Sequence, residues 1–306
     1  MLKYSKIVGI VLLVFLFAMC NQKSKNDTKE TILKGSIDIT VDETVKPIID
    51  DQVAVFEGTY YGAKIIVKPK SEVELINDLL NQKAKVVVTA RNLTAEELLR
   101  FEKSKIKPRV TPFAIDAIAL ISNKSNNDTL IALKTVLDFM QGKKDTGIKG
   151  LVFDNPNSST VHYMKELAKV KDIPSAGVFS FKTNNEVIKF VSENEGMIGV
   201  VGVNWLSQPS ADMVDFIKKV NILGVKGLKE NKYYYPSQND LAEEKYPLAR
   251  DLFIINCQGY SGLGMGFSSF VAGDIGQRII LKSSLMPVKT PGRKLQIRSQ
   301  IINDKE

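Results

Sequence analysis

Apolar residues along the chain alternate between short runs rich in β-branched residues and longer stretches with helical spacing. Residues 72–80 place apolar side chains three and four positions apart, and residues 186–191 show the same spacing, which predicts amphipathic helices. The strand-like runs are 36–40, 64–67, 85–89, 117–122, 150–153, 196–201 and 252–257. This alternation predicts an α/β protein in which mixed or parallel sheets are flanked by helices.

Two apolar segments, residues 112–120 and 246–255, are too long for edge strands, and we interpret each as a crossover strand between two lobes. Two crossings place the N- and C-terminal parts of the chain in the same lobe. We therefore predict that lobe 1 contains residues 34–115 plus 247–306 and that lobe 2 contains residues 116–246. Ligands in such α/β pairs bind between the lobes, at strand C-termini and helix N-termini.

The N-terminus has the pattern of a secretory signal. Lys3 and Lys6 precede an apolar run of 13 residues, 7–19, which is short for a membrane span but typical of a signal h-region. The run ends in Leu-Phe-Ala-Met-Cys at Cys20, which resembles a bacterial lipobox, in which the cysteine is lipidated. We predict a lipoprotein signal peptide over 1–20, a tether over 21–33, and a periplasmic-side location in the cell envelope. The alternative is an uncleaved N-terminal anchor.

Composition and charge narrow the function classes. The chain has two cysteines, Cys20 and Cys257, so with the first lipidated no disulfide is expected. The formal charge of +8 becomes +6 when Lys3 and Lys6 are removed, which suits attraction of a small anion. The lysines are scattered without interleaved aromatic residues, so we expect no nucleic-acid partner. A single histidine, His162, cannot build a metal cluster, and no metal or cofactor is predicted.

The glycine-rich segment 259–266, Gly-Tyr-Ser-Gly-Leu-Gly-Met-Gly, does not support an enzyme. A dinucleotide-binding loop opens a βαβ unit and is followed by an acidic residue about 20 positions later. A nucleophile elbow requires Gly-x-Ser-x-Gly, whereas Ser261 is followed by Gly262 and Leu263. The histidine of an α/β-hydrolase follows its serine, but His162 precedes this segment. We therefore predict that the protein is not an enzyme.

Four segments resemble, in chain order, the phosphate-binding proteins of ABC importers, periplasmic binding proteins whose lobes are joined by two crossover strands. Residues 37–47 are similar to the family's first strand and its turn into a helix, and 88–97 are similar to its Ser-Asp-Arg-Pro-Leu-Thr segment. Residues 153–160 are similar to the Arg-x-x-x-Ser-Gly-Thr loop, and 194–202 are close to Asn-Pro-Gly-Ala-Ile-Gly-Tyr-Val-Gly. The resemblance covers roughly residues 35–290 and implies this two-lobed fold.

The resemblance also implies where a ligand binds. Helix N-termini carry unpaired N–H groups and a partial positive charge, so two of them facing across a cleft form an anion site. Hydroxyl side chains at these turns can donate to oxyanion oxygens. The predicted ligand-binding residues are Glu43, Thr44, Arg91, Asp154, Asn157, Ser158, Ser159 and Thr160. The alternatives are that the hydroxyl residues only cap helices and that Arg91 lies on the surface or between the lobes.

Two of these residues depart from the family pattern. Asp154 occupies the position of the family's phosphate-pairing arginine, and Glu43 replaces a small polar residue of the first turn. Losing a charge-assisted hydrogen bond removes roughly 1.5–3 kcal/mol of binding free energy. A carboxylate about 4 Å from one phosphate charge adds about 4 kcal/mol of repulsion at an effective dielectric constant of about 20. Binding is compatible with these carboxylates if they accept a hydrogen bond from a protonated phosphate oxygen or if Arg91 neutralises them. The remaining alternative is that both carboxylates point to solvent at the edges of their loops.

The function implied by the resemblance is that of a monomeric, lipid-anchored solute-binding protein. It would capture phosphate or a related small oxyanion and deliver it to an inner-membrane ABC permease. The alternative is a binding-protein-like envelope lipoprotein that acts as a sensor or accessory subunit without transport, with a ligand other than phosphate.

Overall fold

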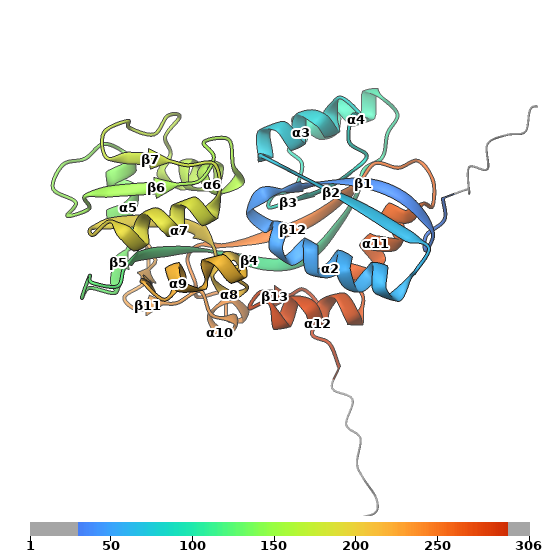
Figure 1. The fold of residues 1–306 in the computed structure, drawn as a ribbon. Helices are drawn as coiled ribbons and strands as arrows, with labels where there is room; N and C mark the ends of the chain where they lie inside the picture. The colour runs from blue at the N-terminus through green and yellow to red at the C-terminus, as the bar shows by residue number, and fades with distance from the viewer. Residues whose placement is uncertain (1–29, 293–306) are drawn as a thin grey trace, which may run out of the picture.

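The computed structural model describes residues 30–292, in which ten strands form one mixed sheet (Figure 1). The order is β2-β1-β3-β12-β4-β8-β6-β7, and β9 and β13 also pair with β4. The strands are β1 (Gly35–Asp42), β2 (Ala63–Lys70), β3 (Val86–Thr89), β4 (Arg109–Asn123), β6 (Gly150–Phe153), β7 (Val178–Ser180), β8 (Met197–Gly202), β9 (Val220–Ile222), β12 (Ala249–Asn256) and β13 (Met286–Pro287).

Three short strands form a second sheet, and helices flank both parts of the large sheet. The small sheet contains β11 (Tyr233–Tyr234), β10 (Gly224–Lys226) and β5 (Leu130–Ala132). The helices are α2 (Lys46–Thr59), α3 (Glu72–Leu80), α4 (Ala95–Lys103), α5 (Leu133–Met140), α6 (Ser159–Ala168), α7 (Asn184–Glu193), α8 (Asn204–Ser207), α9 (Val214–Ile217), α10 (Gln238–Ala242), α11 (Leu263–Val271) and α12 (Asp274–Lys282), with 3-10 turns at Glu43–Val45 and Ala211–Met213.

The long strand β4 joins two lobes, because it pairs with β12 along its first part and with β8 along its second. We call the part around β1, β2 and β3 lobe 1, and the part around β6, β7 and β8 lobe 2 (Figure 1). Neighbouring strands are parallel within each lobe, whereas β12 and β4 are antiparallel to their neighbours. The predicted two-lobed α/β fold with two crossover strands is confirmed. The residue boundaries between the lobes remain a prediction, since β4 continues through position 115/116.

The strands predicted from the apolar pattern are all present in the structure. Each of the seven strand-like runs overlaps an observed strand, and α3 has the predicted bounds 72–80. The pattern missed β5, β7, β9, β10, β11 and β13, which have only two or three residues. Such short strands contain too little alternation to stand out from a loop.

A continuous apolar core passes through the crossover and positions the site. It contains Ile39 and Val88 of lobe 1, Ile118 of β4, and Leu151 and Val200 of lobe 2, all of which are buried. Side chains on a strand alternate between its faces, so a strand covered on both faces is apolar throughout. The core therefore holds the C-terminal ends of β1 and β6, where polar residues begin, at the junction of the lobes.

Within residues 30–292, no helix is both long enough and apolar enough to cross a membrane. The predicted signal peptide, Cys20 and most of the predicted tether lie outside the described residues.

Candidate functional site

The turn after β1 buries Thr44 in a fixed orientation. The strand ends at Asp42, and Oδ1 of Asp42 accepts hydrogen bonds from the backbone N–H of Thr44 at 3.0 Å and from its hydroxyl at 2.9 Å. An aspartate at this position suits the start of a helical turn, whose first N–H groups have no partner inside the helix. Both side chains are fully buried, so Thr44 faces the inside of the junction between the lobes.

The N-terminus of α6 approaches the same point from lobe 2. Ser158 caps this helix, because its hydroxyl accepts a hydrogen bond from the backbone N–H of Val161 at 3.2 Å. Ser159 and Thr160 lie in the first turn and are buried. The hydroxyl oxygens of Ser159 and Thr44 are 2.9 Å apart, so the two lobes meet in a direct hydrogen bond.

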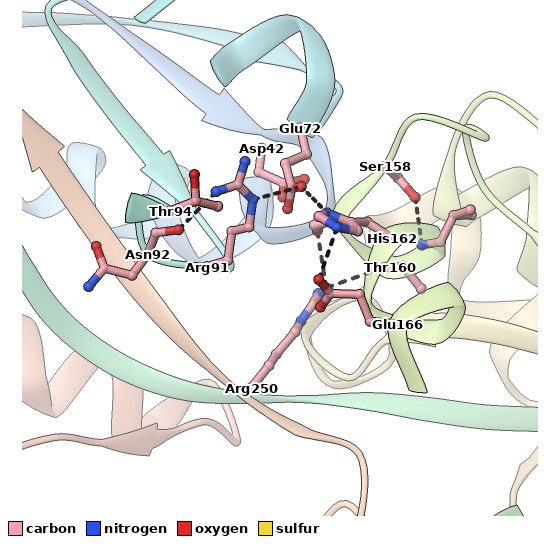
Figure 2. A network of polar contacts seen from close by, with 12 residues as sticks. Asp42, Glu72, Arg91, Asn92, Thr94, Ser158, Thr160, His162, Glu166 and Arg250 are labelled. Carbon is pink, nitrogen blue, oxygen red and sulfur yellow. Dashed lines mark hydrogen bonds and ion pairs between the residues drawn. The ribbon is translucent and has the colours of Figure 1, made fainter. Parts of the chain in front are cut away.

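Arg250 of β12 lies at the centre of these hydroxyls, and Figure 2 shows it extending from its strand toward Thr160. Its Nη1 donates to Ser159 Oγ at 3.1 Å and to Thr160 Oγ1 at 3.5 Å, and its Nη2 donates to Thr44 Oγ1 at 3.3 Å. Its Nε and Nη2 also donate to Oδ2 of Asp116 at 3.0 and 2.8 Å. Asp116 lies on β4, directly opposite Arg250 in the strand pairing. We call Thr44, Ser159 and Thr160 the hydroxyl cluster.

Asp154, directly after β6, is buried, which excludes the alternative that it points to solvent. Its two oxygens accept hydrogen bonds from the hydroxyl of Ser158 and, at 3.1 Å, from the side-chain amide of Asn184. Burial raises the pKa of Asp154 to about 7, and the neighbouring charges of Asp42 and Glu43 act in the same direction. The carboxyl group therefore holds its proton to a much higher pH than an exposed aspartate does.

The core of the site contains more carboxyl groups than cationic groups. Arg250 lies among Asp42, Asp116 and Asp154, and all four residues are buried. Burial raises the pKa of Asp42, an effect that the charge of Arg250 only partly offsets. Oδ2 of Asp42 and Oδ1 of Asp116 accept no hydrogen bond from any described residue, although both atoms are buried. Unpartnered buried carboxyl oxygens favour a ligand that carries hydrogen-bond donors.

Three predicted residues make no hydrogen bond to the hydroxyl cluster among the described residues. Arg91 donates to Glu72 at 3.1 Å and to Glu97 at 2.8 and 2.9 Å, so its positive charge is paired with two carboxylates of lobe 1. The side chain of Asn157 is exposed. Glu43 is partly buried beside the cluster, and burial followed by the charge of Asp42 raises its pKa. That these three residues contact the ligand directly remains a prediction.

The sequence analysis missed Arg250 and Asp42 as site residues. A signal for Arg250 was present, because a charged residue within an apolar crossover segment requires a buried partner. Asp116 is the corresponding charged residue of the other crossover. For Asp42 the signal was its position between a strand and a helical turn, where aspartate commonly caps.

The hydroxyl cluster is closed in this structure. Since Thr44 and Ser159 are in direct hydrogen-bond contact, no ion fits between them without a movement of the lobes. Trp205 of α8 makes another contact across the junction, because its indole N–H donates to the carbonyl oxygen of Thr44 at 2.9 Å. A hinge movement of two lobes around crossover strands would open both contacts.

The fold and the site define a two-lobed binding protein. Residues 26–274 match the family model described as "PBP superfamily domain", and the chain belongs to this family.

Among curated proteins, the chain is 24% identical over 304 residues to the phosphate-binding protein PstS of Borreliella burgdorferi, with 92% of this chain and 99% of the relative covered. Solved structures share the fold. A Clostridium perfringens protein with bound phosphate, described as the substrate-binding protein of a phosphate ABC transporter, has a TM-score of 0.68 and 19% identity, covering 83% of this chain and 100% of that one. An ABC-type phosphate transport receptor from Vibrio cholerae has a TM-score of 0.63 and 17% identity, with the same coverage.

Proposed function

We propose that the protein is an extracytoplasmic, lipid-anchored solute-binding protein that captures phosphate or a related tetrahedral oxyanion for an inner-membrane ABC permease. The observation that carries the proposal is the convergence of the hydroxyl cluster, drawn from both lobes, on the guanidinium group of Arg250. Hydroxyl and guanidinium donors around one point are suited to oxyanion oxygens. The relatives named above, described as phosphate-binding or phosphate-transport proteins, support the same ligand class.

Binding in this proposal begins with separation of the lobes, which breaks the contact between Thr44 and Ser159. The anion then enters between the turn after β1 and the N-terminus of α6, and Arg250 supplies the positive charge. The unpartnered oxygens of Asp42 and Asp116 favour an oxyanion that still carries a proton, because only a P–OH group can donate to a carboxylate. Fully ionised sulfate offers no such donor and is expected to bind more weakly.

The function of an accessory or sensor lipoprotein without phosphate transport is the second candidate. The observation that favours it is the charge of the site, where Arg250 lies among three buried carboxyl groups. One of them is Asp154, which the sequence resemblance aligns with the family's arginine. Repulsion between these carboxylates and a phosphate dianion would oppose binding. In this case the fold is retained and the ligand is something other than phosphate.

Calorimetry separates the two candidates. The tag-free segment 21–306 is titrated with phosphate, sulfate and a phosphonate at pH 6 and pH 8. The transport receptor is expected to release or absorb heat with phosphate and to bind sulfate more weakly. A protein that binds none of the three anions at either pH would contradict the proposal and favour the second candidate.

Removal of single hydroxyl groups tests the location of the site. Ser159→Ala and Thr160→Val are each expected to weaken phosphate binding by roughly 1–3 kcal/mol, because each leaves a buried polar partner without its hydrogen bond. Ser175→Ala, at an exposed position of lobe 2, is the matched control and should bind as the wild type does. Tight phosphate binding that ignores both cluster substitutions would place the site elsewhere.

The membrane anchor is tested at Cys20. Cys20→Ala is expected to leave the protein as an unprocessed precursor or to release it from the membrane, because the acyl chains attach to this sulfur in the proposal. Mass spectrometry and labelling with a radioactive fatty acid measure the outcome. Lipid labelling that persists in the variant would contradict the anchor.

A further inference from the structure

A further polar contact joins the lobes through two residues that are not members of the hydroxyl cluster. Glu72 is the first residue of α3 in lobe 1, and its Oε1 lies 2.6 Å from Nδ1 of His162 on α6 in lobe 2. Figure 2 shows the carboxylate of Glu72 between Arg91 and His162. The Glu72 side chain is only 4% exposed, whereas that of His162 is 42% exposed and accessible to solvent protons. The backbone N–H of Val73 also donates to the carbonyl oxygen of Asn157 across this edge, at 3.4 Å.

The charged groups around His162 come from both lobes. Glu72 of α3 faces Nδ1, and Glu166, one turn later on α6, lies 3.3 Å from Nε2. Arg91, in the segment after β3, is the neighbouring cation and pairs with Glu72 and with Glu97 of α4. Among residues 30–292, Glu72 is the carboxylate that pairs with His162 across the junction, whereas Glu166 belongs to the same helix as the histidine.

We propose that Glu72 and His162 form a pH-dependent latch between the lobes, which favours the closed arrangement when the imidazole is protonated. In this role His162 is a positioning residue that holds the hydroxyl cluster together without contacting the ligand. The effect of the latch on ligand affinity rests on the proposed function, whereas its effect on lobe closure does not.

The direction of the pH dependence follows from the two partners. The hydrogen bond with Glu72 raises the pKa of His162 above its usual value near 6.5. Burial acts to raise the pKa of Glu72, but the hydrogen bond from His162 and the charge of Arg91 outweigh it, and this pKa is lowered. The latch is therefore fully formed at about pH 5–6.5, where both groups are charged. It weakens as the pH rises through the pKa that His162 has in the closed form.

Arg91 makes the latch reversible. It belongs to the same lobe as Glu72 and needs no lobe closure for its contact at 3.1 Å. When the lobes separate, Glu72 keeps this partner and is not left as a buried carboxylate without a counter-charge, which would be strongly unfavourable. Opening therefore costs the Glu72 carboxylate its contact with His162 but not its contact with Arg91.

The single tryptophan of the chain reports closure directly. Trp205 lies in lobe 2, and its indole N–H donates to the Thr44 carbonyl oxygen of lobe 1. Separation of the lobes removes this hydrogen bond and changes the surroundings of the indole. Tryptophan emission therefore measures the closed fraction without any added ligand.

The experiment records tryptophan emission of segment 21–306 from pH 5 to pH 9. In the wild type the closed-to-open ratio is expected to fall about two- to fivefold as the pH rises, which is the size expected for a partly exposed ion pair. His162→Gln and Glu72→Gln should remove this transition. His162→Lys should keep the closed emission up to pH 9, because lysine retains its charge. Glu166→Gln is the matched control, since it alters the other neighbour of His162 within one lobe, and it should retain a transition.

Two outcomes would overturn the latch. A transition that persists unchanged in both His162→Gln and Glu72→Gln assigns the pH dependence to another group, such as Asp154. A wild-type emission that stays constant over the whole range shows that His162 does not control closure. Both results are independent of phosphate binding, so the proposed function can stand or fall separately.

Discussion

Replacing Arg250 with glutamine is expected to abolish phosphate binding, with a loss of at least about 2–5 kcal/mol, the usual effect of truncating one partner in a buried charge pair. Arg250 is the cation that contacts all three members of the hydroxyl cluster. Without it, an anion would enter a site whose remaining charged groups are carboxyls. Calorimetry with phosphate measures the effect.

The same change also tests the stability of the closed core. Asp116 would keep a buried carboxylate without its guanidinium partner, and breaking such a pair typically lowers the free energy of unfolding by about 3–5 kcal/mol. Arg250→Lys is the more conservative variant, because it keeps the charge but cannot reach Thr44, Ser159 and Asp116 together. It should fold and still bind phosphate more weakly than the wild type.

Arg109→Gln provides the matched control, since Arg109 lies on the neighbouring crossover strand β4 but is exposed. It should leave both phosphate affinity and stability close to those of the wild type. Phosphate affinity at the wild-type level in a folded Arg250→Lys or Arg250→Gln variant would show that the anion is bound without this arginine.

Replacing Asp154 with asparagine is expected to stabilise the protein at alkaline pH. Burial raises the pKa of Asp154 to about 7 in the folded protein, against a usual value near 4. The folded state therefore binds this proton more tightly than the unfolded state, and stability falls as the pH rises from about 4 to about 7. At pH 8.5 the ionised carboxylate lowers the free energy of unfolding by about 4 kcal/mol, as an order of magnitude.

An asparagine preserves the size of the side chain and can still hydrogen-bond to Ser158 and Asn184. Asp154→Asn should therefore raise the free energy of unfolding strongly at pH 8.5 and only slightly at pH 4.5. Urea titrations at the two pH values measure both numbers. Asp172→Asn, at an exposed position, is the control and should change neither. Equal effects of Asp154→Asn at both pH values would refute this assignment of its ionisation.

The fold class was predictable from the sequence because it depends on local patterns. The run at 150–153 is apolar at every position, as a strand buried on both faces requires, and α3 follows from apolar spacing within nine residues. The hydroxyl residues were predicted from helix-terminus chemistry together with the resemblance to the family's segments. Thr44, Ser159 and Thr160 stand at turns between a strand and a helix, where hydroxyl side chains and free N–H groups are expected.

The tertiary structure decided which charges meet, and no local pattern contains that information. Arg250 and Asp116 are 134 positions apart, and they pair because β12 and β4 run antiparallel in a register that places them opposite each other. From the sequence, Asp154 could face either solvent or the ligand. The structure shows that it is buried and that it accepts hydrogen bonds from Ser158 and Asn184.

The sequence by itself determined the two lobes, the crossover strands and the turns that carry the hydroxyl groups. Only the tertiary structure decided that Thr44 contacts Ser159 and that Glu72 contacts His162, across 115 and 90 positions of the chain. The physical reason is the range of the forces involved. Hydrophobic spacing and helix capping act over a few residues, whereas the partner of a buried charge is chosen by the packing of distant elements.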